Sequence, residues 1–226
     1  MVIQSPSLAN INLLDFGAQM KELEEAGITM VHIDIMDGHY VPNLCLPLNV
    51  VKHIRRDYKA MKLDVHLMVD SPEDYIATLA EDGADYISFH GDSTSFVRKL
   101  VSSIQKYHVK AGVVINPSQP VEVISPYAEY LDYVTLMAVE PGTAGQTCLR
   151  GTPERLRQLA AFRKQNGLDF KIFIDGGMTF EMIEECIKNG ADVIVTGVYA
   201  IFQQEDGIKG AAGRFERAVE SLRCEV

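Results

Sequence analysis

The sequence has no surplus of positive charge: it holds 21 Lys+Arg against 31 Asp+Glu, so its formal net charge is 21 − 31 = −10. Nucleic acids and anionic membrane surfaces are bound through clustered Lys and Arg, so we expect neither as a partner. The chain also lacks an apolar run of about 18 residues, so no transmembrane helix is expected. Its first six residues carry no basic flank and no long apolar stretch, so we expect no secretory signal.

Cysteine is scarce and scattered. The four cysteines form no CxxC pair; they are Cys45, Cys148, Cys186 and Cys224. A chain long enough to bury a large core needs no disulfide framework, and a four-cysteine zinc site would need close ligand pairs. Four unrelated thiols are typical of a reducing compartment, so we expect a cytoplasmic protein.

No Pro/Gly/Ser-rich linker and no low-complexity segment divides the 226 residues. A short apolar segment, a helical segment, a glycine and another apolar segment recur instead. The apolar segments are rich in Val, Ile and Tyr, which is typical of buried parallel strands. They lie at residues 2–7, 30–36, 61–68, 86–90, 110–115, 133–139, 171–174 and 193–196.

Helical patterns fill the gaps, for example at residues 13–26, 72–80 and 179–189. Ser71 stands where it could cap the second of these helices. Three junctions share a glycine that could adopt the left-handed conformation at a helix end, two or three residues before the next strand. These glycines are Gly27, Gly83 and Gly190.

Alternation of strands and helices predicts parallel pairing, because parallel neighbours need a crossover connection. Eight units in this length predict a single (β/α)₈ TIM barrel over residues 1–226, with a C-terminal helix at about 206–223. An open doubly wound sheet is the alternative, but the dinucleotide fingerprint G-x-G-x-x-G is absent.

The segment at 31–39, VHIDIMDGH, carries the first chemical signal. Alternate residues of a strand share a face, so His32 and Asp34 point together while Ile33 and Ile35 point the other way. The isoleucines suit the helix-covered side, which places His32 and Asp34 inside the barrel. A buried carboxylate is costly unless it is paired, so Asp34 needs a counter-charge.

The next strand repeats this pattern with Asp64 and His66, and the seventh strand is followed by Asp175. All of these can converge near the carboxyl ends of the strands, where barrel chemistry is found. Imidazole and carboxylate together suit Zn²⁺, Mn²⁺ or Fe²⁺. A buried His bonded to a buried Asp is also a common structural device, so spacing alone leaves both interpretations open.

Glycine-rich turns follow the last three strands, in PGTAGQ at 141–146, at Gly176-Gly177 and at Gly197. Glycine permits close backbone approach, and barrel phosphate sites use these loops, although glycine is common in any turn. Methionines end three of the strands, at Met36, Met68 and Met137; filling gaps in the core is their ordinary role.

Longer strings add to these signals: SPSL at 5–8, HIDIMDGHYVPN at 32–43, LDVHLMV at 63–69, NP at 116–117, MAVEPG at 137–142 with GQ at 145–146, and DGG at 175–177. Together they resemble the ribulose-phosphate 3-epimerase family from about residue 6 to residue 202. The resemblance implies a barrel that inverts C3 of a ketose phosphate through an enediolate. It implies interconversion of ribulose 5-phosphate and xylulose 5-phosphate, in a dimer or hexamer.

The resemblance also implies roles for individual residues. One divalent metal ion (Zn²⁺, Fe²⁺ or Mn²⁺) would be bound by His32, Asp34, His66 and Asp175, and Asp34 and Asp175 would be the acid/base pair. Substrate contacts would come from Ser7, His66, Met36, Met68 and Met137. Phosphate-binding turns would comprise Gly142, Thr143, Ala144, Gly145, Gly176, Gly177, Gly197 and Val198.

Two departures concern the substrate. The family's Gly-Phe-Gly-Gly loop is Gly142-Thr143-Ala144-Gly145 here, and its Gly-Ser after the eighth strand is Gly197-Val198. Backbone amides survive both changes, so a sugar phosphate remains the expected ligand despite the negative net charge. The SPSL start and the Ala-Gly-Gln loop look closer to the branch that acts on allulose 6-phosphate, so the length of the sugar stays open.

Two further alternatives remain. A related barrel decarboxylase or hexulose-phosphate synthase would have an Asp-x-Lys strand end, and none of the expected strands ends that way. A non-catalytic barrel that binds sugar phosphates would be expected to lose some of the four implied metal ligands, and all four are present.

Overall fold

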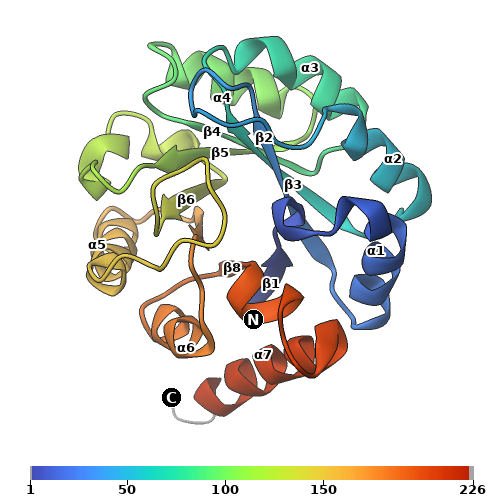
Figure 1. The fold of residues 1–226 in the computed structure, drawn as a ribbon. Coiled ribbons are helices and arrows are strands. Elements are labelled where there is room, and N and C mark those ends of the chain that lie inside the picture. Colours follow the sequence, from blue (N-terminus) through green and yellow to red (C-terminus); the bar gives the residue numbers. More distant parts are fainter. Residues whose placement is uncertain (1, 224–226) are drawn as a thin grey trace.

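Eight parallel strands form one sheet that curves into a barrel, with helices outside it (Figure 1). The structure is a computed structural model that describes residues 2–223. The strands are β1 (Ile3–Pro6), β2 (Met30–Met36), β3 (Lys62–Met68), β4 (Tyr86–His90), β5 (Lys110–Ile115), β6 (Tyr133–Met137), β7 (Lys171–Asp175) and β8 (Val193–Thr196).

Hydrogen bonding runs through the sheet in the order β1-β8-β7-β6-β5-β4-β3-β2. The two end strands, β1 and β2, meet at a bridge between Ser7 and His32, so the barrel is nearly closed. The (β/α)₈ barrel expected from the sequence is confirmed, and each strand agrees with its predicted segment to within two residues at either end.

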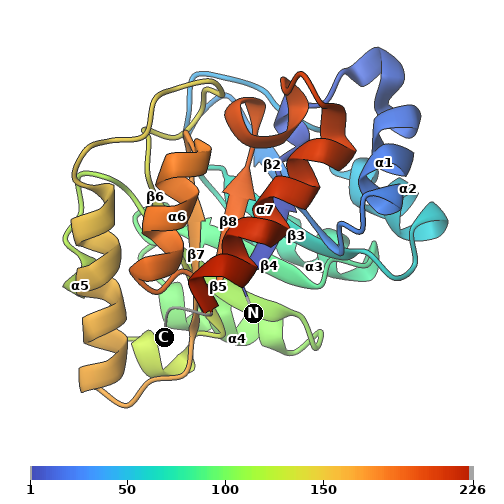
Figure 2. The ribbon, with the colours of Figure 1, turned by 90° about the horizontal axis from the view of Figure 1, so that it is seen from below.

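The helices cover the outer surface of the barrel (Figure 2). They are α1 (Phe16–Glu25), α2 (Asn49–Asp57), α3 (Glu73–Glu81), α4 (Val97–Gln105), α5 (Thr152–Gln165), α6 (Phe180–Lys188) and α7 (Gly207–Arg223). The junction glycines Gly27, Gly83 and Gly190 adopt positive φ as expected. None of the helices between residues 2 and 223 has both the length and the apolar character needed to cross a lipid bilayer.

Two local predictions were wrong. Ser71 does not cap α3: the N-cap is Pro72, without a side-chain hydrogen bond, and Ser71 instead accepts the Asp74 amide through its carbonyl, at 3.2 Å. The unit after β5 holds two short 3₁₀ turns, η3 (Val121–Ile124) and η4 (Ala128–Tyr130), instead of an α-helix. Prolines interrupt this segment at 117, 120 and 126, and each removes a helical donor.

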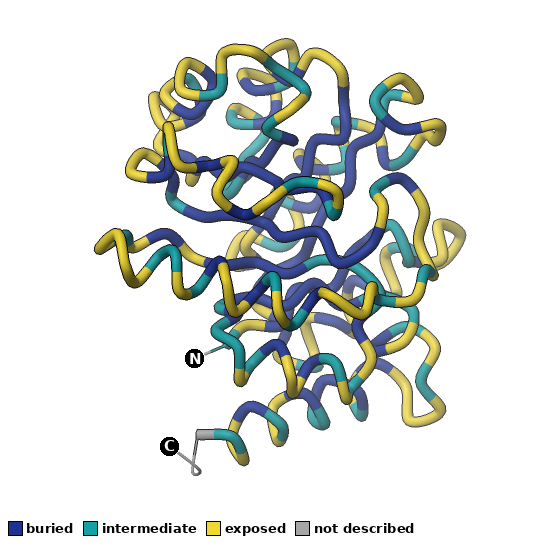
Figure 3. Tube along the Cα trace, turned by 90° about the vertical axis from the view of Figure 1, so that its left-hand side faces the viewer, coloured by how far each residue is buried: buried dark blue, intermediate teal, exposed yellow. Residues whose placement is uncertain are grey.

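The strands are buried almost throughout, whereas the helices alternate buried and exposed residues (Figure 3). Ile33 and Ile35 belong to the main apolar core beneath the helices, as predicted from the alternation along β2. Inside the barrel, the Tyr133 ring packs at a tilt against Phe173, with 4.5 Å between ring centres. Gly112 on β5 leaves room for this ring, because a Cβ there would lie 2.4 Å from Tyr133 Cζ.

Aspartates that precede β4, β6 and β8 tie neighbouring strands together at their amino ends. Asp85, Asp132 and Asp192 each accept a backbone amide from the second residue of the preceding strand, at 2.9 to 3.0 Å. Each also pairs with the lysine that begins that strand. This end of a barrel contributes to stability rather than to chemistry.

The described thiols are free, at Cys45, Cys148 and Cys186. Cys224 lies outside the described residues.

Candidate active site

The register between β2 and β3 sets two acid–imidazole pairs side by side. His32 is opposite Asp64 and Asp34 is opposite His66, with Met36 opposite Met68 one step further along the strands. Both histidines and Asp64 are fully buried, and Asp34 is 5% exposed. The convergence expected from alternation along these strands is therefore present in the fold.

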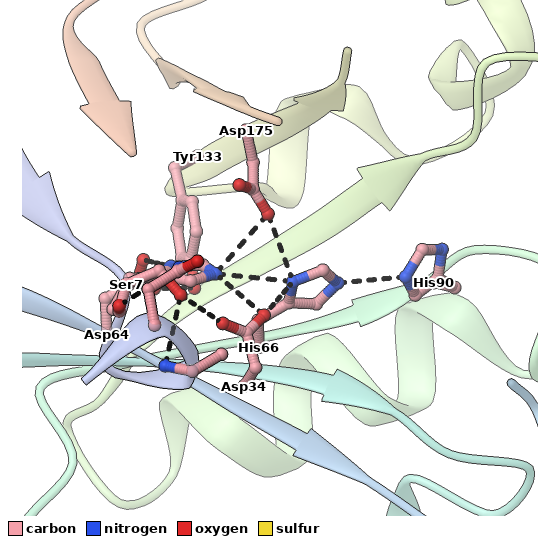
Figure 4. A network of polar contacts seen from close by, with 10 residues as sticks. Ser7, Asp34, Asp64, His66, His90, Tyr133 and Asp175 are labelled. Atoms are coloured by element: carbon pink, nitrogen blue, oxygen red, sulfur yellow. Dashed lines mark hydrogen bonds and ion pairs between the residues drawn. The ribbon is translucent and has the colours of Figure 1, made fainter. Parts of the chain in front are cut away.

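Four residues bring one donor atom each to a common point, within 4.8 Å of one another: His32, Asp34, His66 and Asp175. His32 Nε2 lies 3.3 Å from His66 Nδ1, 3.4 Å from Asp34 Oδ1 and 3.6 Å from Asp175 Oδ2. His66 Nδ1 lies 3.4 Å and 3.6 Å from the same two oxygens. Asp34 and Asp175 approach the His66 ring from opposite sides (Figure 4).

These separations fit a metal ion. Tetrahedral ligands at about 2.1 Å from zinc are about 3.4 Å apart, and the five measured separations are close to that value. Two imidazoles and two carboxylates also suit Fe²⁺ and Mn²⁺, so the donors do not select one metal.

Partners of the outer ring nitrogens orient both imidazoles (Figure 4). His32 Nδ1 lies 2.6 Å from Asp64 Oδ2, and Asp64 Oδ1 accepts the Tyr133 hydroxyl at 3.0 Å. His66 Nε2 lies 2.9 Å from His90 Nε2. Because these contacts occupy the outer nitrogens, the inner nitrogens are left to face the common point, an arrangement typical of metal-bound histidine.

Burial and charge oppose each other at this cluster. Burial alone would raise the pKa of Asp34, but His32 and His66 hold that pKa well below its ordinary value. Burial alone would lower the pKa of His32, yet Asp34 and Asp64 raise it well above its ordinary value. The counter-charge that Asp34 requires thus comes from the two imidazoles, and the cluster favours ionised carboxylate.

Ser7 completes the surroundings of Asp34. Its hydroxyl donates to Asp34 Oδ2 at 2.7 Å, while Asp34 Oδ1 faces the imidazoles. Ser7 is positioned by its bridge to His32, at the closure between β1 and β2. One carboxylate is thereby fixed through both of its oxygens.

A pocket opens from Asp34 and Asp175 at the carboxyl end of the barrel. Residues named from the sequence supply most of its lining: Ser7, Asp34, Met36, Met68, Met137, Gly142, Thr143, Ala144, Gly145, Asp175, Gly176, Gly177, Gly197 and Val198. His32 and His66 lie beneath this lining and are fully buried. The structure thus groups His66 with the metal-ligand candidates and not with the residues that line the pocket.

The loop after β6 packs tightly against the turn after β7. A Cβ on Gly177, whose φ is +65°, would lie 2.3 Å from the backbone nitrogen of Cys148. On the other side of the loop, Asn43 Nδ2 donates to the Gly142 carbonyl at 2.8 Å. Gln146 Nε2 donates within the loop, to the carbonyls of Glu140 and Thr143. Backbone amides are therefore held close to the pocket.

Sequence reasoning did not single out several residues around the site. His90 ends β4, so the strand-end signal that marked Asp175 also applied to it. Tyr133 begins its strand, and no local pattern shows that its hydroxyl reaches Asp64. Asn10, Glu140 and Tyr199 also line the pocket, and their places depend on how distant loops meet.

Comparisons with known proteins agree with this geometry. Residues 3–202 match the ribulose-phosphate 3 epimerase family. The ribulose-phosphate 3-epimerase of Bacillus subtilis (strain 168) is 35% identical over 207 residues, which are 91% of this chain and 94% of that protein. The ribulose-phosphate 3-epimerase of Escherichia coli (strain K12) is 32% identical over 222 residues, which are 98% and 95%.

Among solved structures, 3-hexulose-6-phosphate synthase from Salmonella typhimurium matches with a TM-score of 0.74 at 15% identity, over 98% of this chain and 99% of that chain. A likeness at this identity shows a shared fold only. The family match and these two relatives show the family as well as the fold, because they span nearly the whole sequence. This chain belongs to the ribulose-phosphate 3-epimerase family of isomerases.

Proposed function

We propose that the protein is a metal-dependent 3-epimerase that interconverts ribulose 5-phosphate and xylulose 5-phosphate. The observation that carries the proposal is the position of Asp34 and Asp175, which line one pocket from β2 and β7 and approach the His66 ring from opposite sides in Figure 4. Inversion of a carbon needs a proton removed on one face and delivered on the other. Two carboxylates that flank the substrate can do both.

Asp34 is suited to remove the C3 proton, because its carboxylate lines the pocket from the end of β2. The Ser7 hydroxyl stabilises the ionised form of Asp34 through Oδ2. Asp175, which enters the step in its protonated form, then delivers that proton to the other face of C3, and the two residues exchange roles in the reverse direction. Met36, Met68 and Met137 form a low-polarity wall that limits water near C3 without exchanging protons.

His32, Asp34, His66 and Asp175 would hold the divalent cation. When bound, it would stabilise negative charge on the substrate oxygens next to C3 as the proton leaves. With the cation bound, the inner nitrogens of both imidazoles would be ligands and the rings would be neutral, with their outer nitrogens facing Asp64 and His90.

We assign the substrate phosphate to the turns after β6, β7 and β8. Backbone N–H groups in such turns bind phosphate without a basic side chain. This explains how a chain of net charge −10 can bind an anionic substrate.

The pocket lining also favours testing a six-carbon substrate. Thr143 replaces the phenylalanine usual in the family's loop, and Thr143 and Val198 both line the pocket. Comparing kcat/KM for D-ribulose 5-phosphate and D-allulose 6-phosphate tests the assignment. The proposal predicts higher kcat/KM for the pentulose. A preference for the hexulose would move the assignment to allulose 6-phosphate and fructose 6-phosphate. A protein that binds metal and both sugars without turnover would be a binding barrel.

A further inference from the structure

The turn after β8 has an unusual backbone. It is the π-helix η5 (Val198–Phe202), and the amide of Gln203 donates to the carbonyl of Val198, five residues back, at 3.1 Å. The Gly197 carbonyl accepts from the amides of Ala200, Ile201 and Phe202 at 3.0 to 3.4 Å. π-Helical turns are rare and often occur at functional sites. This one displays Tyr199 directly after Val198 at the pocket.

Tyr199 reaches across to the loop after β6. Its hydroxyl donates to the Gly145 carbonyl at 2.5 Å, and the two residues are 54 positions apart in sequence. Both residues line the pocket, and Figure 2 shows the loop after β6 (gold) and the turn after β8 at the same end of the barrel. The contact therefore joins two of the turns assigned to the substrate phosphate.

The loop at 140–146 is anchored by side chains from two other loops. Asn43 holds Gly142 from the loop after β2, and Tyr199 holds Gly145 from the turn after β8. Gln146 cross-links the loop internally. Without the Tyr199 hydroxyl, the Gly145 carbonyl loses this hydrogen bond. The distance between the Gly145 end of the loop and the Val198 amide is then no longer fixed by a side chain.

We propose that Tyr199 is a positioning residue that presets the spacing between the phosphate-binding turns after β6 and β8. It acts through the Gly145 carbonyl and takes no part in proton transfer. The proposal rests on the assignment of these turns to phosphate. Because the Tyr199 hydroxyl bonds to the Gly145 carbonyl and not to the His/Asp cluster, its loss should weaken binding of the anion and leave the metal site unchanged.

Tyr199→Phe tests this directly, because it removes one hydroxyl and keeps the ring. Tyr199 is 40% exposed, so the variant should fold. The lost hydrogen bond is a neutral one, so we expect the dissociation constant for inorganic phosphate to rise about threefold to tenfold, equivalent to about 0.7–1.4 kcal/mol. KM for the ketose phosphate should rise similarly, with kcat and zinc affinity unchanged. Tyr107→Phe is the matched control: Tyr107 is 43% exposed and lies outside the pocket lining.

Phosphate binding, measured by calorimetry on the zinc-loaded wild type and both variants, separates the outcomes. Weaker binding by Tyr199→Phe alone supports the proposal. Equal binding by all three proteins, or no phosphate binding by the wild type, overturns it. A lack of epimerase turnover with normal phosphate binding would contradict the proposed function but leave the Tyr199 result interpretable.

Discussion

Asp64 is the residue whose replacement best separates metal positioning from metal ligation. Its carboxylate is fully buried, 2.6 Å from His32 Nδ1, and it accepts the Tyr133 hydroxyl at 3.0 Å. Asp64→Asn keeps the shape and can keep both hydrogen bonds, because the asparagine oxygen can face His32 and the Tyr133 hydroxyl can turn to accept from the amide. What is lost is the negative charge behind His32.

The expected cost follows from that charge. A carboxylate hydrogen-bonded to a metal-binding imidazole makes the imidazole a stronger ligand, and removing it typically weakens metal binding by about 10- to 100-fold. That range corresponds to about 1.4–2.7 kcal/mol. The fold should survive because no cavity forms, but at a cost of about 1–3 kcal/mol, since the amide brings a buried N–H and the Tyr133 hydroxyl loses its acceptor.

Zinc titration against a competing chelator measures this effect, and thermal unfolding of the metal-free protein measures the cost to the fold. Asp85→Asn is the control: Asp85 is likewise a hydrogen-bonded carboxylate, here accepting the Leu63 amide, but it lies at the amino ends of the strands. It should lower stability and leave zinc affinity unchanged. Zinc affinity of Asp64→Asn within twofold of the wild type would refute the role given to Asp64.

Two further predictions concern the two ends of the barrel. Burial alone would raise the pKa of Asp132 and of Asp192, but nearby Lys and Arg side chains and backbone amides lower both pKa values overall. The stabilisation that these two carboxylates give is therefore present above about pH 4. It is lost as the pH falls through their depressed folded-state pKa values. Between pH 7 and pH 3, the free energy of unfolding in urea should fall less for the double variant Asp132→Asn/Asp192→Asn than for the wild type. An equal fall in both proteins would contradict this. Gly177→Ala should raise KM for a ketose phosphate at least tenfold, because its Cβ would clash with the Cys148 backbone. Gly167→Ala, with nearly the same φ of +63° and open space around it, should cost about 1 kcal/mol of stability and leave KM unchanged.

Periodicity along the strands predicted much of this molecule. Alternation placed His32 and Asp34 on one face of β2 and Ile33 on the other, and parallel pairing then brought His66 beside Asp34. These features are local and repeat with a period of two, so a single sequence contains them. The three prolines between β5 and β6 are also plain in the sequence. The regular count of eight strand–helix units nevertheless predicted a helix there, where the prolines prevent one.

Contacts between distant segments were not predictable in this way. Tyr133 reaches Asp64 because Gly112, on a third strand, leaves space for its ring. Tyr199 reaches Gly145 only after two loops have folded over the same pocket. Such contacts depend on barrel closure and loop conformation, and neither leaves a periodic signal in the sequence.

The central claim is that Asp34 and Asp175 exchange the proton on C3 of a ketose phosphate. Proton NMR in deuterium oxide, with zinc-loaded protein and D-ribulose 5-phosphate, measures this directly. The account predicts deuterium at C3 together with formation of xylulose 5-phosphate, and loss of turnover in folded Asp34→Asn and Asp175→Asn. Epimerisation retained in both variants, or a metal-loaded wild type that introduces no deuterium at C3, would contradict it.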